Sequence, residues 1–459
     1  MGMGRKKGRE KQQGLWVAAS EIVTTPGHLY YERLNTVLNA EKFDQRVEAL
    51  CRKYYKSSSG RPSLTPGTYF RLLLLGYFEG IDSERGIAWR AADSLSLRKF
   101  LGYDLSEQTP DHSTVSRTRR LYAVETHRAV MQWVLKILRK HGLAQGQTVC
   151  IDATTLEANA AMKSLVRRDT GIGYDEYLKQ LAVAEGIENP TKEQAARLDR
   201  KRKKKGSNDD WTNPNDPSAR ITKMKDGRTK LAHKAEHAVD LADGALLAVT
   251  VQPADRGDTS SYVETLEAAQ VESRKAYPAG IEEVVMDKGY HSGAVMMDLA
   301  RRGLRSYVPE PERGRRKWAG KLLERQRVYA NRRRVRGDRS KRLQKLRGEL
   351  CERSFAHCYE TGAMRRLHLR GSDNVLKRVL VHAAAFNIGL LLRKLSGWGK
   401  PRVAQGAVQV LVAISFNVSQ LHRAFSGWIE TFATELSLEI PRNRTNRPCS
   451  HNASSATGC

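Results

Sequence analysis

The chain has 459 residues, of which 40% are hydrophobic and 28% are charged, a balance typical of soluble globular proteins with two or three domains. Lys and Arg number 79 against 50 Asp and Glu, so the formal net charge at pH 7 is +29. This excess excludes an acidic or neutral surface overall and indicates a polyanionic partner, nucleic acid above all. Charge alone identifies a partner and not a reaction, because ribosome-like or merely cationic proteins share it.

Cysteine usage and the chain ends indicate an intracellular protein. The six cysteines have no CxxC spacing, which argues against a zinc cluster or a disulfide framework and favours a reducing compartment. Residues 1–14 are basic but lack the apolar core of a signal peptide, and we predict disorder there and in residues 441–459. The longest apolar run, 379–392, is too short to span a membrane and predicts a buried helix. We therefore expect a cytoplasmic, nucleoid-associated protein.

Residues 15–145 have a helical pattern and predict an all-α N-terminal domain. Thr65 and Pro66 are a cap and a first-turn residue for a helix that continues with an apolar face. A further helix is predicted near 85–93, and a long one over 122–141 closes the domain.

Between these two helices, Pro110 and Asp111 precede a segment that combines hydroxyl and guanidinium groups at a predicted helix start. Short hydroxyls and arginines in this position suit phosphate and base-edge contacts by a helix-turn-helix. An ordinary solvated amphipathic helix explains the same pattern equally well. The candidate DNA-binding residues are Ser113, Thr114, Arg117, Arg119 and Arg120.

A first aspartate follows an apolar strand at the start of the next domain, for which we predict residues 146–395. The strand covers 147–153 and ends at Asp152, although an aspartate there is also a common cap for a following helix. Residues 163–225 then interrupt the sheet with two predicted helices and a loop. The basic run 200–205 in this insertion is a solvated helix end or, alternatively, a phosphate contact.

The sheet resumes with a hairpin, for which Asp243 and Gly244 are the two-residue turn signal. His233 and His237 are four residues apart, a spacing that binds zinc on a helix, but the segment is predicted to be extended and no cysteine is near. An amphipathic helix is predicted to open at Asp258.

A second aspartate also follows an apolar strand. The run Val284 to Met286 stops at Asp287, and Lys288 and Gly289 come next. A carboxylate at the end of a buried strand is held by a rigid element yet faces solvent, which suits a metal ligand or a general base. Taken alone, Asp287 is more simply explained as a turn residue.

The segment 311–347 holds 16 Lys or Arg and three acidic residues, a net charge of +13. Trp318 and Tyr329 interleave with these cations as rings that could stack on bases. A charge run is usually only solvated surface. Here it directly precedes a third acidic residue, Glu352, which the spacing of Phe355 and Tyr359 places on an inward-leaning apolar face of a helix.

The sequence around Glu352, the third acidic residue, allows two interpretations. Glu352 forms a structural ion pair with Arg347 or Arg353, or it has a function. Two-metal phosphodiester chemistry needs two to four carboxylates around a pair of divalent cations. Asp152, Asp287 and Glu352 are the candidate catalytic and metal-binding residues, with the basic segment beside them to bring in a polyanion.

From about residue 60 to 395 the sequence resembles the DDE transposases of bacterial insertion sequences, whose catalytic domain is RNase H-like. VCIDATTLEANA is similar to the stretch of the first acid and matches Asp152, VVMDKGYHS matches Asp287, and ERSFAHCYETGAMRRLHLRG matches Glu352. YFRLLLLGYFEG and TPDHSTVSRTR resemble the family's N-terminal domain, which is implicated in recognising transposon ends, and DPSARITKMKDGRTKLAHKAEHAVD resembles its hairpin region.

The resemblance implies an RNase H-like mixed α/β sheet flanked by helices, with an all-α N-terminal DNA-binding domain and a helical insertion. It implies two Mg²⁺ ions, with Mn²⁺ as a substitute, and double-stranded DNA partners: terminal inverted repeats and target DNA, with a homodimer on the DNA. Many relatives place Tyr, Arg and Lys at fixed offsets around the glutamate, where this chain has Lys345, Gly348 and Tyr359. Arg347 or Arg353 is the candidate replacement for the phosphate-binding arginine, and Glu349 and Glu360 are the alternative glutamates.

The sequence therefore predicts a transposase that cleaves element ends and transfers strands. The alternatives are a catalytically inactive DNA-binding descendant of such an enzyme and a purely hydrolytic nuclease. In the basic segment, the candidate DNA contacts are Arg332, Arg333, Arg334, Arg347 and Arg353. Residues 396–440 are predicted to form a helical C-terminal extension.

Overall fold

The computed structural model describes residues 28–55, 63–201, 207–224, 226–312, 314 and 316–401. The predicted tails, 1–14 and 441–459, and nearly all of the predicted extension 396–440 lie outside these residues.

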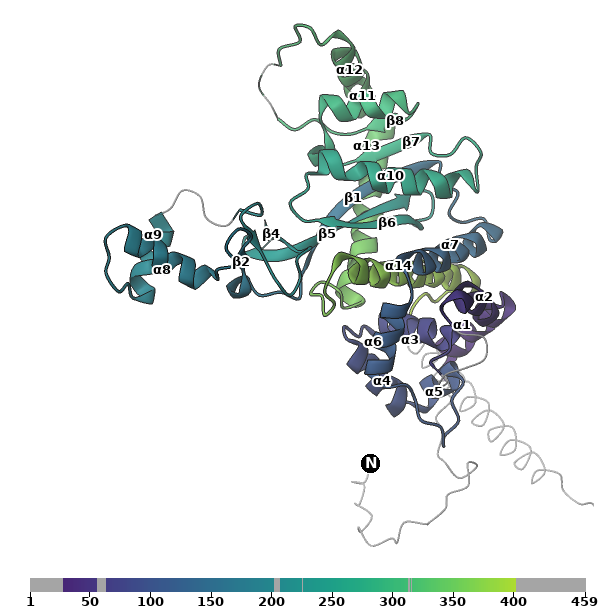
Figure 1. Cartoon of the computed structure of the whole chain (residues 1–459). Coiled ribbons are helices and arrows are strands. Elements are labelled where there is room, and N and C mark those ends of the chain that lie inside the picture. The colour runs from purple at the N-terminus through teal and green to yellow at the C-terminus, as the bar shows by residue number, and fades with distance from the viewer. Residues whose placement is uncertain are drawn as a thin grey trace, which may run out of the picture. The chain divides into compact units, whose positions relative to one another are not determined.

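A mixed six-stranded sheet forms the centre of the predicted domain 146–395 (Figure 1). The strand order is β4-β5-β1-β7-β8, and β6 pairs with β5. The β1–β7 and β7–β8 pairs are parallel, whereas β5 is antiparallel to β1, β4 and β6. The strands are β1 (Thr148–Glu157), β4 (Arg220–Lys223), β5 (Thr229–Asp240), β6 (Leu246–Pro253), β7 (Glu283–Met286) and β8 (Arg305–Tyr307).

Alternation along β5 assigns a helix to each face of this sheet. Glu236 accepts hydrogen bonds from Ser261 and Thr265 of α10 (Asp258–Arg274). The next residue, His237, points to the opposite face and bonds with Ser354 of α13 (Asp338–Phe355). Figure 1 shows α10 in front of the sheet and α13 behind it.

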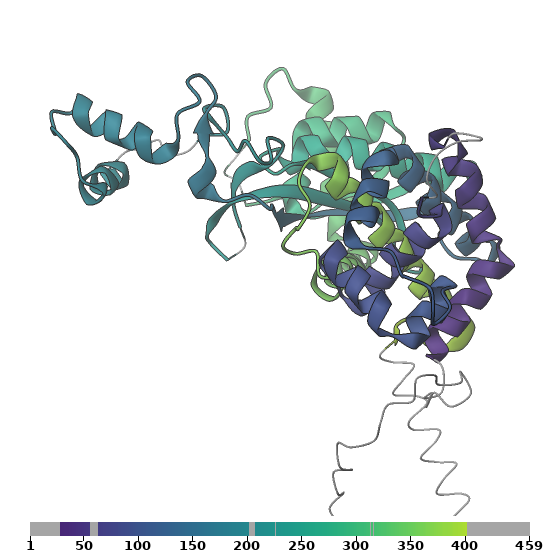
Figure 2. The ribbon, with the colours of Figure 1, turned by 60° about the horizontal axis from the view of Figure 1, so that its bottom comes forward.

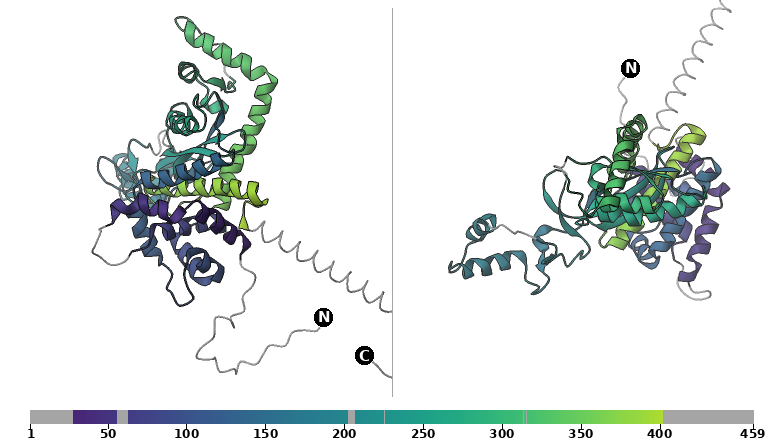
Figure 3. Two further views of the ribbon diagram at one scale, coloured as in Figure 1. Left: turned by 90° about the vertical axis from the view of Figure 1, so that its right-hand side faces the viewer. Right: turned by 90° about the horizontal axis from the view of Figure 1, so that it is seen from above.

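The remaining helices of the domain pack around these layers. The buried helix predicted around 379–392 is confirmed as part of α14 (Ser372–Ser396), which packs along α7 and against β6 (Figure 3). It is the one helix among the described residues that is long and apolar enough to span a membrane, but 89% of its most apolar window is buried. The other elements are α11 (Gly293–Arg301), α12 (Leu322–Arg336), η4 (Lys288–Tyr290) and the π-helical turn η5 (Ala356–Thr361).

The N-terminal region is helical, as predicted. Thr65 caps α3 through its hydroxyl, Pro66 is the first residue of α3, and Gly80 ends it at a φ of 69°. The helices are α1 (Leu29–Ala40), α2 (Phe43–Cys51), α3 (Pro66–Glu79), α4 (Glu84–Asp93), α5 (Leu95–Leu101), α6 (His112–Leu121) and α7 (Val124–Lys140), with a short helix η2 (Arg52–Tyr54).

The predicted insertion between β1 and β4 contains two helices, α8 (Tyr174–Ala184) and α9 (Lys192–Lys201). Thr191 and Gln194 form the capping box of α9. The helices pack mainly on each other and stand apart from the sheet in Figure 2. The short elements η3 (Met162–Ser164), β2 (Val166–Arg167) and β3 (Trp211–Thr212) join the insertion to the sheet around a small core that includes Leu165, Trp211 and Leu231.

The predicted hairpin is confirmed, but its connection is longer than the two residues predicted, since residues 241–245 separate β5 from β6. Asp243 and Gly244 lie in the turn between β5 and β6, where Gly244 has a φ of 82°. One strand boundary is wrong: β1 does not end at Asp152 but continues to Glu157, because β5 pairs with it along the whole length. The pairing of β1 with β7, however, stops at Ile151. Asp152 is thus the first residue of β1 beyond that parallel pair.

Candidate active site

Asp152 and Asp287 occupy equivalent positions on neighbouring parallel strands. Ile151 of β1 pairs with Met286 of β7, and each is followed directly by an aspartate. Because parallel strands keep their residues in step, the two aspartates leave the pair at the same level of the sheet. The topology thus brings together two residues that are far apart in sequence.

The Asp152 carboxylate accepts hydrogen bonds from the adjacent backbone and from α13. Its Oδ1 accepts a hydrogen bond of 2.8 Å from the backbone N–H of Ala153, and its Oδ2 accepts one of 2.6 Å from Arg347 Nη1. The ion pair is partly open to solvent, since about a fifth of each side chain is exposed. Arg347 belongs to α13, so this contact joins β1 to the helix that covers its face.

Asp287 caps the short helix η4 and accepts a hydrogen bond from the backbone N–H of Gly289. A methyl group at position 289 would meet Asp258 Oδ2 at 2.7 Å and Asp287 Oδ1 at 2.9 Å. The two carboxylates therefore converge on one point, which only a glycine leaves open. Asp258 is neutralised by Lys234 of β5, whose Nζ lies 2.5 Å from its Oδ1.

Glu352 is on α13, but its side chain is exposed. The prediction that it leans inward on an apolar face is wrong. The face of α13 toward the sheet contains instead Arg347, Cys351 and Ser354, and the chain changes to π-helical spacing after Phe355. Among the residues that the structure describes, no three His, Cys, Asp or Glu side chains are grouped to hold a metal ion. The role of Glu352 stays a prediction.

Arg347 and Arg353, the two arginines near Glu352, do not pair with it as one interpretation of the sequence expected. Arg347 pairs with Asp152, and Arg353 pairs with Glu349 at 2.5 Å. The structural alternative for Glu352, an ion pair with one of these arginines, is therefore not the arrangement seen. Glu349 is itself engaged by Arg353, and Glu360 by Arg365.

A buried histidine lies opposite Asp152 across the β1–β5 pair. His237 Nδ1 is 2.9 Å from Ser354 Oγ, and its Nε2 is 2.6 Å from Tyr359 Oη. Burial lowers the pKa of His237 to about 3, so the ring is neutral near pH 7. His233 bonds to buried Asp216 instead, and the weaker zinc interpretation of the histidine pair gains no support.

Sequence reasoning missed the residues that position the Asp287 loop. Tyr290 donates to Glu236, and Lys234 donates to Asp258 and Ser261. Burial raises the pKa of Glu236, and burial with the charges of nearby carboxylates, Asp152 among them, raises that of Tyr290. The sequence did contain a signal for this network: Lys234 and Glu236 are charged residues two positions apart in a strand whose other central residues are mostly apolar.

The donors at this edge of the sheet suit a hard divalent cation. Asp152 and Asp287 offer carboxylate oxygens from adjacent strands, and the Asp258 carboxylate converges on the Asp287 loop. Carboxylate oxygens are the ligands that Mg²⁺ and Mn²⁺ prefer. The aspartate pair therefore fits such an ion, whereas the exposed Glu352 is not part of this group of oxygens.

The predicted DNA contacts of the N-terminal region lie on α6, which Asp111 caps. Ser113, Arg117 and Arg120 are exposed, and Thr114 is partly buried. Arg119 differs, because its guanidinium is buried and bonds to Glu84 at 2.7 Å and to Asn374 at 2.6 Å. On this helix the charge of Arg119 is used inside the protein, while Arg117 and Arg120 face solvent.

The basic segment divides in the same way along α12 and α13. Arg332 pairs with Glu310, Arg334 donates to the carbonyl of Ser306, and Arg339 pairs with Glu283. Trp318 and Tyr329 contact each other, and Arg332 lies over the Tyr329 ring. The exposed cations of these two helices are Arg325, Arg327, Arg333, Arg336, Arg339, Lys341, Arg342 and Lys345.

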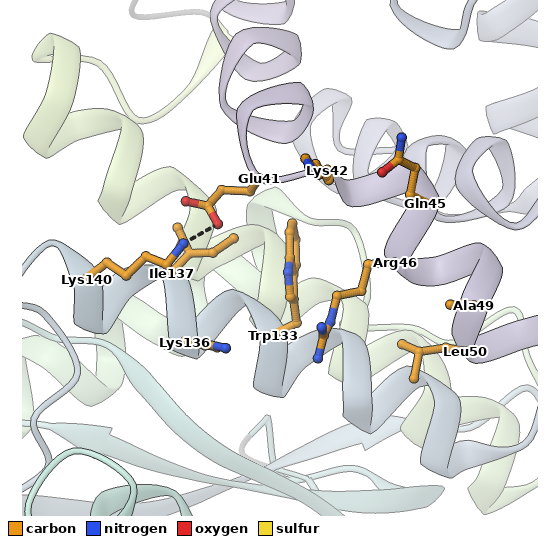
Figure 4. Close-up of a pocket in the computed structure, with 10 residues that line it drawn as sticks. All are labelled: Glu41, Lys42, Gln45, Arg46, Ala49, Leu50, Trp133, Lys136, Ile137 and Lys140. Carbon is orange, nitrogen blue, oxygen red and sulfur yellow. Dashed lines mark hydrogen bonds and ion pairs between the residues drawn. The ribbon is translucent and has the colours of Figure 1, made fainter.

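A separate hollow of about 580 Å³ lies between α2 and α7 (Figure 4). Among the described residues that line it, Glu41 is the one acid, and it pairs with Lys140 at 2.6 Å. Lys42, Arg46 and Lys136 surround an apolar floor that includes Trp133. This hollow suits an anion rather than a metal ion and shares no residue with the aspartate pair.

Two family models match the chain. A transposase domain model (DUF772) matches residues 18–121, and a transposase DDE domain model matches residues 143–388, more than half of the chain. The chain therefore belongs to the DDE transposase family. The DDE domain of this family is RNase H-like, in agreement with the mixed sheet flanked by helices. No curated protein and no solved structure matches the chain.

Proposed function

We propose that this transposase cleaves DNA at the ends of an insertion sequence and joins the freed 3′-hydroxyl to target DNA. The observation that supports this most is the register of β1 and β7, which sets Asp152 and Asp287 side by side. The exposed cations of α12 and α13 add to it, since α13 also contacts both strands and would bring the DNA backbone to that place.

The proposed cofactor is a pair of Mg²⁺ ions, with Mn²⁺ as a substitute. Asp152 and Asp287 would hold them, and Glu352 is the proposed third ligand. Bound there, the ions would activate the attacking water or 3′-hydroxyl and stabilise the leaving oxygen. The protein's own contribution is to fix the two carboxylates on rigid strands and to hold the Asp287 loop through Gly289, Tyr290 and Lys234.

The proposed partners are the terminal inverted repeats, bound through α6, and target DNA. Ser113, Thr114, Arg117 and Arg120 would contact the repeats, and Arg119 would hold α6 in position for them. Two ends must be brought together for transposition, so we propose a homodimer on DNA, acting in the bacterial nucleoid.

The test is cleavage of a labelled duplex carrying the element's end. Asp287→Ala should abolish Mg²⁺-dependent cleavage while leaving binding to the same duplex intact. Asp338→Ala is the matched control, because it removes one exposed carboxylate of α13 whose partner, Lys341, is itself exposed. Retained cleavage by the Asp287 variant would refute the proposal.

The same assay separates the alternatives. Absence of metal-dependent cleavage by the natural chain would indicate a DNA-binding descendant of the enzyme. Cleavage without joining of the 3′-hydroxyl to a second duplex would indicate a hydrolytic nuclease.

A further inference from the structure

A short chain of hydrogen bonds on α13 connects the two aspartate-bearing strands. Arg347 Nη1 donates to Asp152 Oδ2 at 2.6 Å, and Arg347 Nε donates to Gln344 Oε1 at 3.0 Å. Gln344 Nε2 in turn donates to the carbonyls of Tyr307 at 2.8 Å and Met286 at 3.3 Å. Met286 is the residue directly before Asp287. The helix therefore links Asp152 to the backbone that leads into Asp287.

The guanidinium of Arg347 occupies one of the two Asp152 carboxylate oxygens that a divalent cation could use. Asp152 Oδ1 already accepts the Ala153 N–H, and Oδ2 carries the positive charge of Arg347. Two cations cannot share one carboxylate oxygen at such distances without strong repulsion. A metal ion on Oδ2 would therefore displace Arg347, and a metal ion on Oδ1 would be repelled by its charge at short range.

The side chain of Arg347 can leave Asp152 only through the torsions of its aliphatic stem, because the guanidinium itself is planar and rigid. Nε donates to Gln344 and Nη1 donates to Asp152. Such a movement turns both donors away from these acceptors and toward the solvent side of α13. Lys341, Arg342 and Lys345 are exposed on the same helix, so a DNA strand lying along α13 would place a phosphate within reach.

The geometry points to Arg347 as a positioning residue that stands in for the cation on Asp152 in the resting protein. Arg347 leaves Asp152 when the site takes up a divalent cation, and it then pairs with a DNA phosphate. This inference rests on the proposed function, because it assumes that Asp152 is a metal ligand. It makes metal uptake and DNA contact two uses of one side chain.

The first test is a titration of the full-length protein with Mn²⁺ in the absence of DNA, with free Mn²⁺ measured by electron paramagnetic resonance. Arg347→Ala should bind Mn²⁺ about 3–10-fold more tightly than the natural chain, since the competing charge is gone. Arg347→Lys keeps the charge without the two-nitrogen reach and should lie between them. Lys345→Ala removes one exposed positive charge from the same helix and should leave the Mn²⁺ affinity unchanged.

Asp152→Asn identifies the site and separates the two possible failures. If Asp152→Asn binds Mn²⁺ as tightly as the natural chain, Asp152 is not a metal ligand. The metal site of the proposed function then fails, and the inference fails with it. If binding depends on Asp152 but Arg347→Ala binds no more tightly than Lys345→Ala, the inference alone is overturned. Thermal unfolding of each variant shows whether it is folded, and Arg347→Lys replaces Arg347→Ala if the latter is not.

The second test concerns the DNA contact. The affinity for a short DNA duplex falls as the salt concentration rises. The slope of the logarithm of affinity against the logarithm of salt concentration is proportional to the number of phosphate contacts. With Ca²⁺ present as the divalent cation, Arg347→Ala should reduce this slope by about one contact. With EDTA, which removes the divalent cation, the same substitution should leave the slope unchanged. Lys345→Ala should reduce it equally in both. An equal effect of Arg347→Ala with and without the metal ion would contradict the exchange.

Discussion

The two faces of the central sheet use charge in opposite ways on the neighbouring strands β1 and β5. Toward α10, Lys234 and Glu236 form a closed network with hydroxyl groups of Ser261, Thr265 and Tyr290. Toward α13, Asp152 pairs with Arg347, and both side chains are partly exposed. The first arrangement holds the fold together, and the second leaves a carboxylate that a different cation can reach.

This difference matters because a site that exchanges ligands cannot be a fully satisfied network. Removing one member of a buried polar network leaves its partners without water or hydrogen bonds, at a cost of about 1–3 kcal/mol for each group. A partly exposed ion pair contributes only about 0–1 kcal/mol and can be replaced by solvent. We therefore expect loss of the charged network on the α10 face to cost more stability than loss of the Asp152–Arg347 pair.

The largest expected effect on stability is that of Glu236→Ala. It removes the acceptor of three buried hydroxyls and should lower the free energy of unfolding by about 3–5 kcal/mol. Asp152→Ala should lower it by less than about 1 kcal/mol. Urea unfolding of the two variants checks this, with Glu236→Gln as the control that keeps the shape and one acceptor oxygen. Similar losses for Glu236→Ala and Asp152→Ala would remove the distinction between the two faces.

A pH effect should also arise on the α10 face of β5. Burial, with the charge of Asp243 as a smaller cause, raises the pKa of Asp240 to about 6. The folded pKa lies above the unfolded value of about 4, so the stability that Asp240 contributes is present below pH 4 and is lost as pH rises through 6. The loss amounts to about 3 kcal/mol.

Asp240→Asn cannot titrate and tests this directly. Its free energy of unfolding, relative to that of the natural chain, should rise between pH 4 and pH 7 by about 3 kcal/mol. The amide of Asn keeps only one of the two oxygens that accept hydrogen bonds from Gly146 and Ala242, and this loss lowers the stability at every pH. Comparing the change in stability between pH 4 and pH 7 removes this constant loss. Parallel pH profiles for the two proteins would contradict the raised pKa.

The smallest effects distinguish two adjacent arginines of α6. Arg119→Ala breaks a nearly buried ion pair with Glu84 and should cost about 2–3 kcal/mol of stability. Arg120 is exposed, so Arg120→Ala should change stability by less than about 0.5 kcal/mol but reduce the salt slope of DNA binding by about one contact. Calorimetry measures the stability, and DNA binding at several salt concentrations measures the slope. A loss of salt slope for Arg119→Ala together with a loss of stability for Arg120→Ala would show that α6 faces DNA differently.

Local features of the fold were predictable from the sequence because their causes are local. The Thr65 and Pro66 helix start, the capping box of Thr191 and the turn at Asp243 each depend on neighbours within a few residues. The equivalence of Asp152 and Asp287 was less direct, since it followed from two apolar runs that each stop at an aspartate. Their shared level in the sheet needed the register of β1 and β7.

What the sequence could not predict depends on distant partners. β1 continues past Asp152 because β5 pairs with it there, and Arg119 is buried because Glu84 and Asn374 meet it. The inward face assigned to Glu352 was wrong because Cys351 and Ser354 turn to the sheet, and η5 changes the helical spacing before Tyr359. Periodicity assumes a uniform helix and cannot anticipate a π-helical turn.

The most direct test of the central claim is a change of metal preference at the second aspartate. Asp287→Cys replaces a hard oxygen ligand by a soft thiolate, which binds Mg²⁺ poorly but accepts Mn²⁺ better. If Asp287 holds the metal ion, the variant should cleave the labelled element end in Mn²⁺ but not in Mg²⁺, while the natural chain uses both. Full cleavage by Asp287→Cys in Mg²⁺ would contradict the account.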